Sequence, residues 1–248
     1  MFRIDEMRSI WKEEVVSPDQ PLWRYFRPDR FVESVQSCAL HFPSARQFED
    51  PFEGAVAVLP HDWPIDPRYR ELEGPDKAFE ELRRLTKISC WHCADYESDA
   101  MWKLYAASRK GVAVRTTAAL LQAALHPFRL APDYGEEEPF WGRIRYVDLH
   151  TERLRGGMEE RFFIKHRAFE WEREFRIVIS VRTAEEFGVS VPAEGIDVPF
   201  DPAVLFESVY LGPALLEPER VAIGDACTAA GLGAQLLTST LLGQPRYT

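Results

Sequence analysis

Short apolar segments of strand-like and helix-like character follow one another at irregular spacing, and this pattern constrains the fold more than any other feature of the sequence. Strands are expected at 22–26, 39–42, 87–91, 111–116, 144–147, 175–181, 208–211 and near 235–242. Helices are expected after Pro28-Asp29 and at 77–85, 98–111, 117–125, 151–166 and 218–230. Because these segments do not recur as regular βαβ units, the sequence predicts an α+β fold with a bent, mixed β-sheet and flanking helices.

The chain is expected to form a single α+β domain over residues 21–248, preceded by a charged N-terminal segment at 1–20. Its 248 residues and 46% hydrophobic content are sufficient for one sizeable core. Internal repeats and low-complexity tracts are not evident in the sequence. Two segments rich in turn-forming residues, 60–76 and 127–139, are expected to be surface excursions.

Charge and cysteine usage narrow the class of protein. The net charge of −10 does not favour a nucleic acid as partner, because domains that bind phosphate backbones usually carry a basic surplus. Four scattered cysteines argue against a secreted disulfide scaffold and favour a reducing compartment. The charged N-terminus and the lack of an apolar run of about 20 residues predict neither a secretion signal nor a membrane span. We therefore expect a cytoplasmic protein without a membrane partner.

The segment 169–176, with the sequence FEWEREFR, places carboxylates at alternate positions at the entry to an apolar strand. If it is extended, Glu170, Glu172 and Glu174 share one face of the strand and Arg173 lies on the other. Like charges on one face repel one another, so this face either is a solvated edge with ion pairs or borders a site that supplies a cation or substrate. The residues alone leave both interpretations open.

A Glu-x-Glu sequence at the mouth of a strand resembles the arrangement in ADP-ribosyltransferases, where a carboxylate stabilises the oxocarbenium ion formed as nicotinamide leaves. The order of the upstream elements is similar too, with Arg24 in a first strand and Ser89 in a middle strand. This resemblance implies an NAD-binding split sheet. It implies that Glu174 stabilises the ribosyl cation, that Glu172 orients or deprotonates the acceptor, and that this acidic pair opens into a pocket facing Arg24 and Ser89.

The same resemblance implies roles in binding NAD, which is a substrate in this interpretation. Arg24 would pair with the phosphates or ribose, Ser89 would brace the catalytic strand, and Trp102 or Tyr105 would stack on a ring. Tyr25 and Arg176 complete the candidate set. Each also has a structural interpretation, as a surface cation, a hydroxyl bonded to the backbone or an aromatic packed in the core.

The chain further resembles a bacterial family catalogued as domain of unknown function 2971. The resemblance rests on motifs spread from about residue 20 to residue 213, namely LWRY at 22–25, FEDPFE at 48–53, ISC at 88–90, MWKLY at 101–105, GV at 111–112, Lys165, EREFR at 172–176 and YLGP at 210–213. Members resemble components of anti-phage defence loci. The resemblance therefore implies a toxin or effector, with a phage trigger or a cognate antitoxin as its partner.

A metal-dependent nuclease is the first alternative, because Asp50, Glu172, Glu174 and Lys165 provide the carboxylates and the lysine that such sites combine. The Asp50-Pro51 turn would hold Asp50 and Glu53 at a loop tip, where they meet a ribose hydroxyl, a cation or their own backbone. The Cys-x-x-Cys at 90–93 lacks the second pair of ligands that structural zinc usually needs, and no metal is expected.

A non-enzymatic sensor or adaptor that recognises a phage protein through an aromatic surface is the second alternative, since the chain contains seven tryptophans. The sequence motifs of P-loop enzymes, Rossmann dehydrogenases and serine hydrolases are not found. The identity of any ADP-ribose acceptor is not predicted. The leading hypothesis is therefore an NAD-consuming transferase or glycohydrolase.

Overall fold

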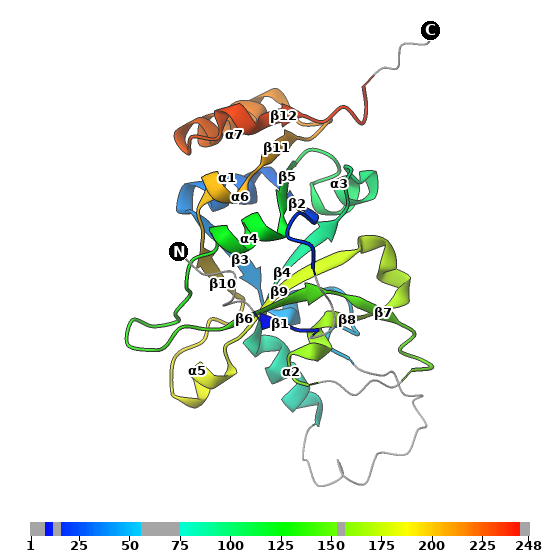
Figure 1. The fold of residues 1–248 in the computed structure, drawn as a ribbon, viewed down its shortest axis with the longest axis vertical. Helices are drawn as coiled ribbons and strands as arrows, with labels where there is room; N and C mark the ends of the chain where they lie inside the picture. The colour runs from blue at the N-terminus through cyan, green and yellow to red at the C-terminus, as the bar shows by residue number, and fades with distance from the viewer. Residues whose placement is uncertain (1–7, 12–15, 56–74, 153–156, 244–248) are drawn as a thin grey trace.

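The computed structural model describes residues 8–11, 16–55, 75–152 and 157–243. It confirms a mixed α+β fold with flanking helices (Figure 1). The strands are β1 (Arg8–Ser9), β2 (Pro21–Phe26), β3 (Ala39–Pro43), β4 (Thr86–Cys93), β5 (Val112–Thr117), β6 (Pro139–Arg143), β7 (Arg145–Val147), β8 (Ile164–His166), β9 (Glu174–Ser180), β10 (Gly195–Pro199), β11 (Ser208–Leu211) and β12 (Leu236–Thr238). The helices are α1 (Pro28–Ser37), α2 (Pro75–Leu85), α3 (Asp99–Tyr105), α4 (Ala118–Ala124), α5 (Arg182–Glu186), α6 (Pro202–Leu205) and α7 (Glu217–Ala229). Four short 3-10 helices are also described: η1 (Ala45–Gln47), η3 (Glu160–Phe163), η4 (Arg167–Glu172) and η5 (Gly233–Gln235).

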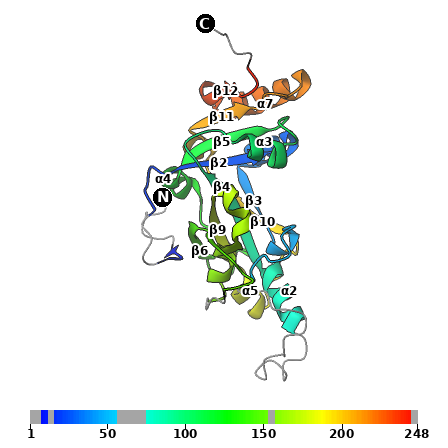
Figure 2. The same ribbon diagram turned by 90° about the vertical axis from the view of Figure 1, so that its right-hand side faces the viewer.

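Eight strands form the main sheet in the order β1-β6-β9-β4-β2-β5-β11-β12. The outer pairs β1·β6 and β11·β12 are parallel and the inner pairs are antiparallel, so the sheet is mixed. Two smaller sheets pair β10 with β3 and β7 with β8. In Figure 2, β2, β5 and β11 run across the view whereas β4 and β9 run down it, which shows that the sheet bends strongly between β2 and β4.

The register explains this bend. Strand β2 pairs with β5 along its whole length, from Pro21 to Phe26. It pairs with β4 only at Leu22 and Trp23, which lie opposite Cys93 and His92. Beyond Trp23 the two strands separate, and the sheet divides into a half that contains β6, β9 and β4 and a half that contains β2, β5 and β11. We call this separation the split.

Alternation along the strands builds separate cores on the two faces of the sheet. Phe175, Ile177 and Ile179 of β9 point into the larger core, which α1, α4, α6 and α7 cover. Val178 points the other way, into a second core with Phe162 and other apolar residues. A third, aromatic cluster lies beneath α3. Odd-numbered and even-numbered residues of β9 therefore lie on opposite faces of the sheet. This alternation determines on which face the charged side chains of β9 lie.

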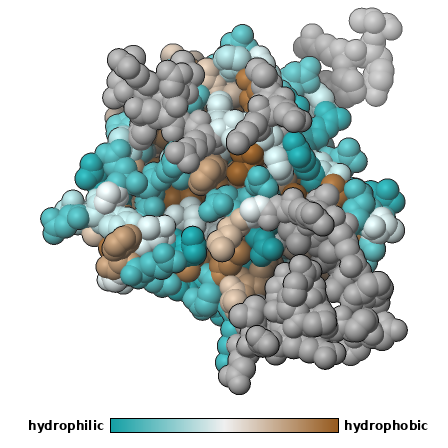
Figure 3. Space-filling model, turned by 60° about the horizontal axis from the view of Figure 1, so that its bottom comes forward, coloured by the Kyte–Doolittle hydropathy of each residue, from teal (hydrophilic) through white to brown (hydrophobic). Residues whose placement is uncertain are grey.

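The N-terminal segment also takes part in packing. Strand β1 adds to the edge of the main sheet beside β6, and Trp11 is buried in the second core. On the face shown in Figure 3, hydrophobic side chains gather in small areas between hydrophilic ones. Within the part of the chain that the structure describes, no helix has the length and apolar character needed to cross a membrane.

The expected strands at 22–26, 39–42, 87–91, 175–181 and 208–211 are confirmed, whereas the helix expected at 151–166 is wrong. The described residues there form η3 and then β8. Phe162, Phe163 and Ile164 are consecutive and all buried, because β8 enters the core and bonds its backbone to β7. Strands β6 and β10 were not predicted. Most of the surface excursion expected at 60–76 lies outside the described residues.

Candidate functional site

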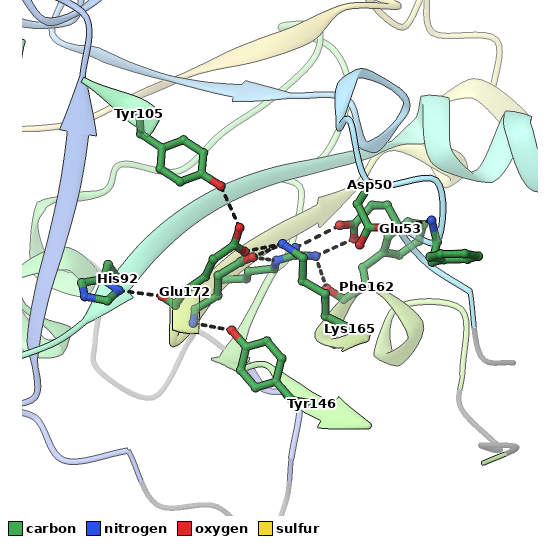
Figure 4. Close-up of polar contacts among 11 residues, drawn as sticks. Asp50, Glu53, His92, Tyr105, Tyr146, Phe162, Lys165 and Glu172 are labelled. Atoms are coloured by element: carbon green, nitrogen blue, oxygen red, sulfur yellow. Dashed lines mark hydrogen bonds and ion pairs between the residues drawn. The ribbon is translucent and has the colours of Figure 1, made fainter. Parts of the chain in front are cut away.

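Five charged side chains are buried together at the start of β9, and we call them the charge cluster (Figure 4). They come from four separate parts of the chain. The members are Glu174 and Arg176 of β9, Glu172 at the end of η4, Lys165 of β8 and Glu53 in the turn after Asp50-Pro51. Burying an ion without a partner costs roughly several kcal/mol. The charge cluster can therefore be buried only because its charged groups pair with one another.

The pairing is extensive. Glu174 accepts from Lys165 Nζ at 2.5 Å on Oε1 and from Arg176 Nε at 2.6 Å on Oε2. Arg176 forms a two-pronged pair with Glu53, with N···O distances of 2.5 and 3.0 Å, and also donates to the Phe162 carbonyl oxygen at 2.8 Å. Lys165 Nζ donates in addition to Glu172 Oε2. Glu174 therefore has both oxygens engaged by cations.

Three carboxylates face two cations in the charge cluster, so complete ionisation would leave one excess negative charge. Burial, together with neighbouring Glu174, raises the pKa of Glu172 to about 7. Burial also opposes ionisation of Glu174, but the charges of Arg176 and Lys165 outweigh it and lower the pKa of Glu174 below its ordinary value. Burial raises the pKa of Glu53 as well, so near neutral pH Glu172 and Glu53 are the carboxyl groups of the cluster that most readily hold its exchangeable proton.

Polar groups outside the cluster hold Glu172 and Glu174 in place. Tyr105 Oη donates to Glu172 Oε1 at 2.7 Å, and the Tyr146 hydroxyl accepts from the Glu174 amide at 2.8 Å. Burial lowers the pKa of His92, so its neutral ring donates from Nδ1 to the Glu172 carbonyl oxygen at 2.6 Å. Sequence reasoning missed Tyr146 and His92, because only the folded register of β7 and β4 brings them here.

A cleft of about 530 Å³ lies at the split. Arg24 of β2, His41 of β3, Asp197 of β10 and Tyr105 of α3 are among its lining residues. Arg24 Nη1 donates to Ser89 Oγ at 2.8 Å and its Nη2 to the His41 carbonyl oxygen at 2.9 Å. The structure thus brings together the cation and the hydroxyl that the sequence predicted on neighbouring strands.

Arg24 is a cation without a charged partner. Burial lowers its pKa to about 10, and its bonded acceptors, Ser89 and a backbone carbonyl, are neutral. Among the described residues no carboxylate lies within ion-pair distance of it. A desolvated guanidinium in this state favours an anion, and its planar donors suit a phosphate or carboxylate in particular.

The expectation that the acidic pair opens directly into a pocket facing Arg24 and Ser89 is wrong. Ser89 lies opposite Ile177 and points toward the larger core, whereas Glu174 lies opposite His92 and points to the other face of the sheet. Glu172 and Glu174 are only 4% and 7% exposed. Neither of them is among the described residues that line the cleft. The reason is that η4 ends before the strand begins, with Arg173 in a left-handed conformation. Glu172 is therefore not on the strand.

Tyr105 connects the two regions. Its side chain lines the cleft and is 45% exposed, while its hydroxyl bonds to Glu172. Trp102 is fully buried in the aromatic cluster and donates to Glu97, so only Tyr105 of this pair offers a ring to the cleft. Tyr25 also lines the cleft, and its hydroxyl accepts from the Ser98 amide.

The carboxylates that were candidate metal ligands bond to other groups of the protein. Lys165 and Arg176 bond to Glu174, and Asp50 Oδ1 accepts from the Phe52 amide within its own turn, leaving Oδ2 buried and unpaired. Over the described ranges, no set of three or more His, Cys, Asp or Glu side chains is grouped to hold a metal ion. Comparison of the chain with protein-family models, with curated proteins and with solved structures finds no match.

Proposed function

We propose that the protein cleaves the bond between nicotinamide and ribose in NAD and transfers ADP-ribose to an acceptor or to water. The observation that carries the proposal is Arg24, a partly buried guanidinium without a charged partner on the wall of a cleft of about 530 Å³. NAD would supply the anionic partner that the Arg24 guanidinium lacks, because the pyrophosphate of NAD is negatively charged. The cleft is also of the size expected for small-molecule sites, roughly 300–1,000 Å³.

The order of the strands supports the same proposal. Arg24, Ser89 and Glu174 lie on β2, β4 and β9, which are neighbours in the main sheet with the serine strand in the middle. The sheet divides between the arginine strand and the serine strand. An elongated ligand bound at the split would contact Arg24 at one place and Tyr105 at another.

We assign Glu172 to the reacting centre, which it reaches through its hydrogen bond with Tyr105 on the wall of the cleft. The glycosidic bond breaks with its electron pair going to nicotinamide, which leaves positive charge on the ribose. Glu174 is a poor stabiliser of that charge because two cations already neutralise it. Glu172 has a pKa of about 7, and positive charge developing nearby favours its ionised form. Glu174 then sets the charge and position of Glu172.

Release of nicotinamide from NAD tests the proposal. The purified protein should convert NAD to nicotinamide and ADP-ribose or an ADP-ribosylated acceptor, measured by chromatography. The rate should be the same with and without EDTA, because the proposed residues hold no metal in the reaction. Absence of nicotinamide release would overturn the proposal, and so would cleavage of nucleic acid that EDTA abolishes.

The biological setting that we propose for this activity rests on the sequence motifs that resemble domain of unknown function 2971. An enzyme that consumes NAD would act as an effector that harms the infected cell. Its activity would then need restraint before infection, by a cognate antitoxin that is absent from the purified protein. This setting is part of the proposal. If the acceptor of ADP-ribose is water the protein is a glycohydrolase, and if it is another molecule the protein is a transferase.

A further inference from the structure

A histidine and an aspartate face each other across the two strands that form one side of the cleft. His41 of β3 and Asp197 of β10 are register partners, and the distance from His41 Nδ1 to Asp197 Oδ1 is 2.8 Å. Both side chains line the cleft beside Arg24. The His41 side chain is 47% exposed, so a molecule in the cleft has access to its ring.

Gly195 and Arg24 contact this histidine in addition to Asp197. A Cβ atom at Gly195 would come within 2.6 Å of His41 Cε1 and 2.7 Å of Nε2, so the imidazole occupies space that only glycine leaves open. The His41 carbonyl oxygen accepts from Arg24 Nη2 at 2.9 Å, which ties the histidine to the anion-binding group. In the tautomer that donates Nδ1–H to Asp197, Nε2 is the ring nitrogen that can accept a proton.

We infer that His41 is the general base that activates the acceptor and that Asp197 is its positioning residue. The inference rests on the proposed function and names the acceptor chemistry as an O–H group, from water or from a hydroxyl. Glu172 cannot take this role directly, because it is buried behind Tyr105. His41 is exposed in the cleft through which an acceptor would approach.

The step balances with no further reactant. The bond from ribose C1′ to the nicotinamide nitrogen breaks, and its electron pair neutralises the charge of the departing pyridinium ring. The acceptor oxygen forms the new bond to C1′ while His41 Nε2 takes its proton. Asp197 stabilises the resulting imidazolium, which then returns the proton to solvent.

Chemical rescue tests the inference. His41→Ala should lower kcat for NAD cleavage by about 100-fold with little change in KM, and added imidazole should restore much of the rate. Asp197→Asn should lower kcat by roughly 10-fold, since it removes orientation and not the base. His126→Ala, which replaces another exposed histidine, should leave the rate unchanged. Thermal unfolding followed by circular dichroism checks that each variant is folded.

The outcomes separate the two proposals. If the wild-type protein releases no nicotinamide, the proposed function and this inference both fail. If the wild-type protein is active and His41→Ala is equally active, the inference alone fails. It fails as well if His41→Ala is folded and inactive but imidazole gives no recovery, because a structural role would lose activity without being rescued by a free base.

Discussion

Arg176→Met should lower the free energy of unfolding by about 3–5 kcal/mol, the loss typical of breaking a buried ion pair. The arginine is fully buried and bonds to Glu53, Glu174 and the Phe162 carbonyl oxygen. Methionine fills much of the same volume but leaves two buried carboxylates with less compensation. Urea denaturation measures the loss.

An exposed ion pair provides the matched control. Arg129 pairs with Glu136, and both side chains are about half exposed. Arg129→Met should therefore change stability by less than about 1 kcal/mol. Adding Glu53→Gln to Arg176→Met should recover part of the loss, because it removes one of the stranded charges. Equal effects of Arg176→Met and Arg129→Met would contradict the buried network.

Glu172→Gln should reduce NAD cleavage by about 10²–10³-fold while the protein stays folded. Glutamine approximates the protonated state that Glu172, with its pKa of about 7, already populates near neutral pH. Its carbonyl oxygen still accepts from Tyr105, and Lys165 keeps its bond to Glu174. Nicotinamide release and thermal unfolding, measured on the same preparation, separate lost chemistry from lost structure.

The same carboxyl predicts a pH dependence. If the ionised form of Glu172 supports cleavage, the rate should rise as pH increases through about 7, and Glu172→Gln should lose the part of this rise that Glu172 contributes. Glu137 is the control, since burial alone raises its pKa to about 7 and it lines a separate small cavity next to the larger core. Glu137→Gln should keep both the rate and its pH dependence. Retention of activity by Glu172→Gln would remove Glu172 from the reacting centre.

Sequence patterns predicted the elements well where local chemistry decides them. Strand β9 was expected because Ile177, Val178 and Ile179 form an apolar run. The helix expected from residue 98 begins as α3 after Ser98, whose hydroxyl accepts from the Met101 amide. The helix expected at 151–166 failed because tertiary pairing of β8 with β7 overrides a pattern of charged and apolar residues.

The site was predicted less completely because its contacts join distant parts of the chain. Glu172, Glu174, Lys165 and Glu53 were each candidates, but the pairing of Glu53 with Arg176 spans 123 residues and depends on the folded sheet. Treating Glu172 as a strand residue placed it on the wrong element, since η4 and the left-handed Arg173 intervene. His41 and Asp197 carry no motif and become partners only through the β3–β10 register.

The central claim, that Arg24 binds the pyrophosphate of NAD at the split, is tested most directly by isothermal titration calorimetry. A Glu172→Gln background slows turnover during the titration by about 10²–10³-fold. In that background NAD should bind, and Arg24→Met should weaken binding by about 30-fold or more, equivalent to at least about 2 kcal/mol for a desolvated charged contact. Arg129→Met should leave the affinity unchanged. Equal affinity of the Arg24→Met protein and its parent would contradict the claim.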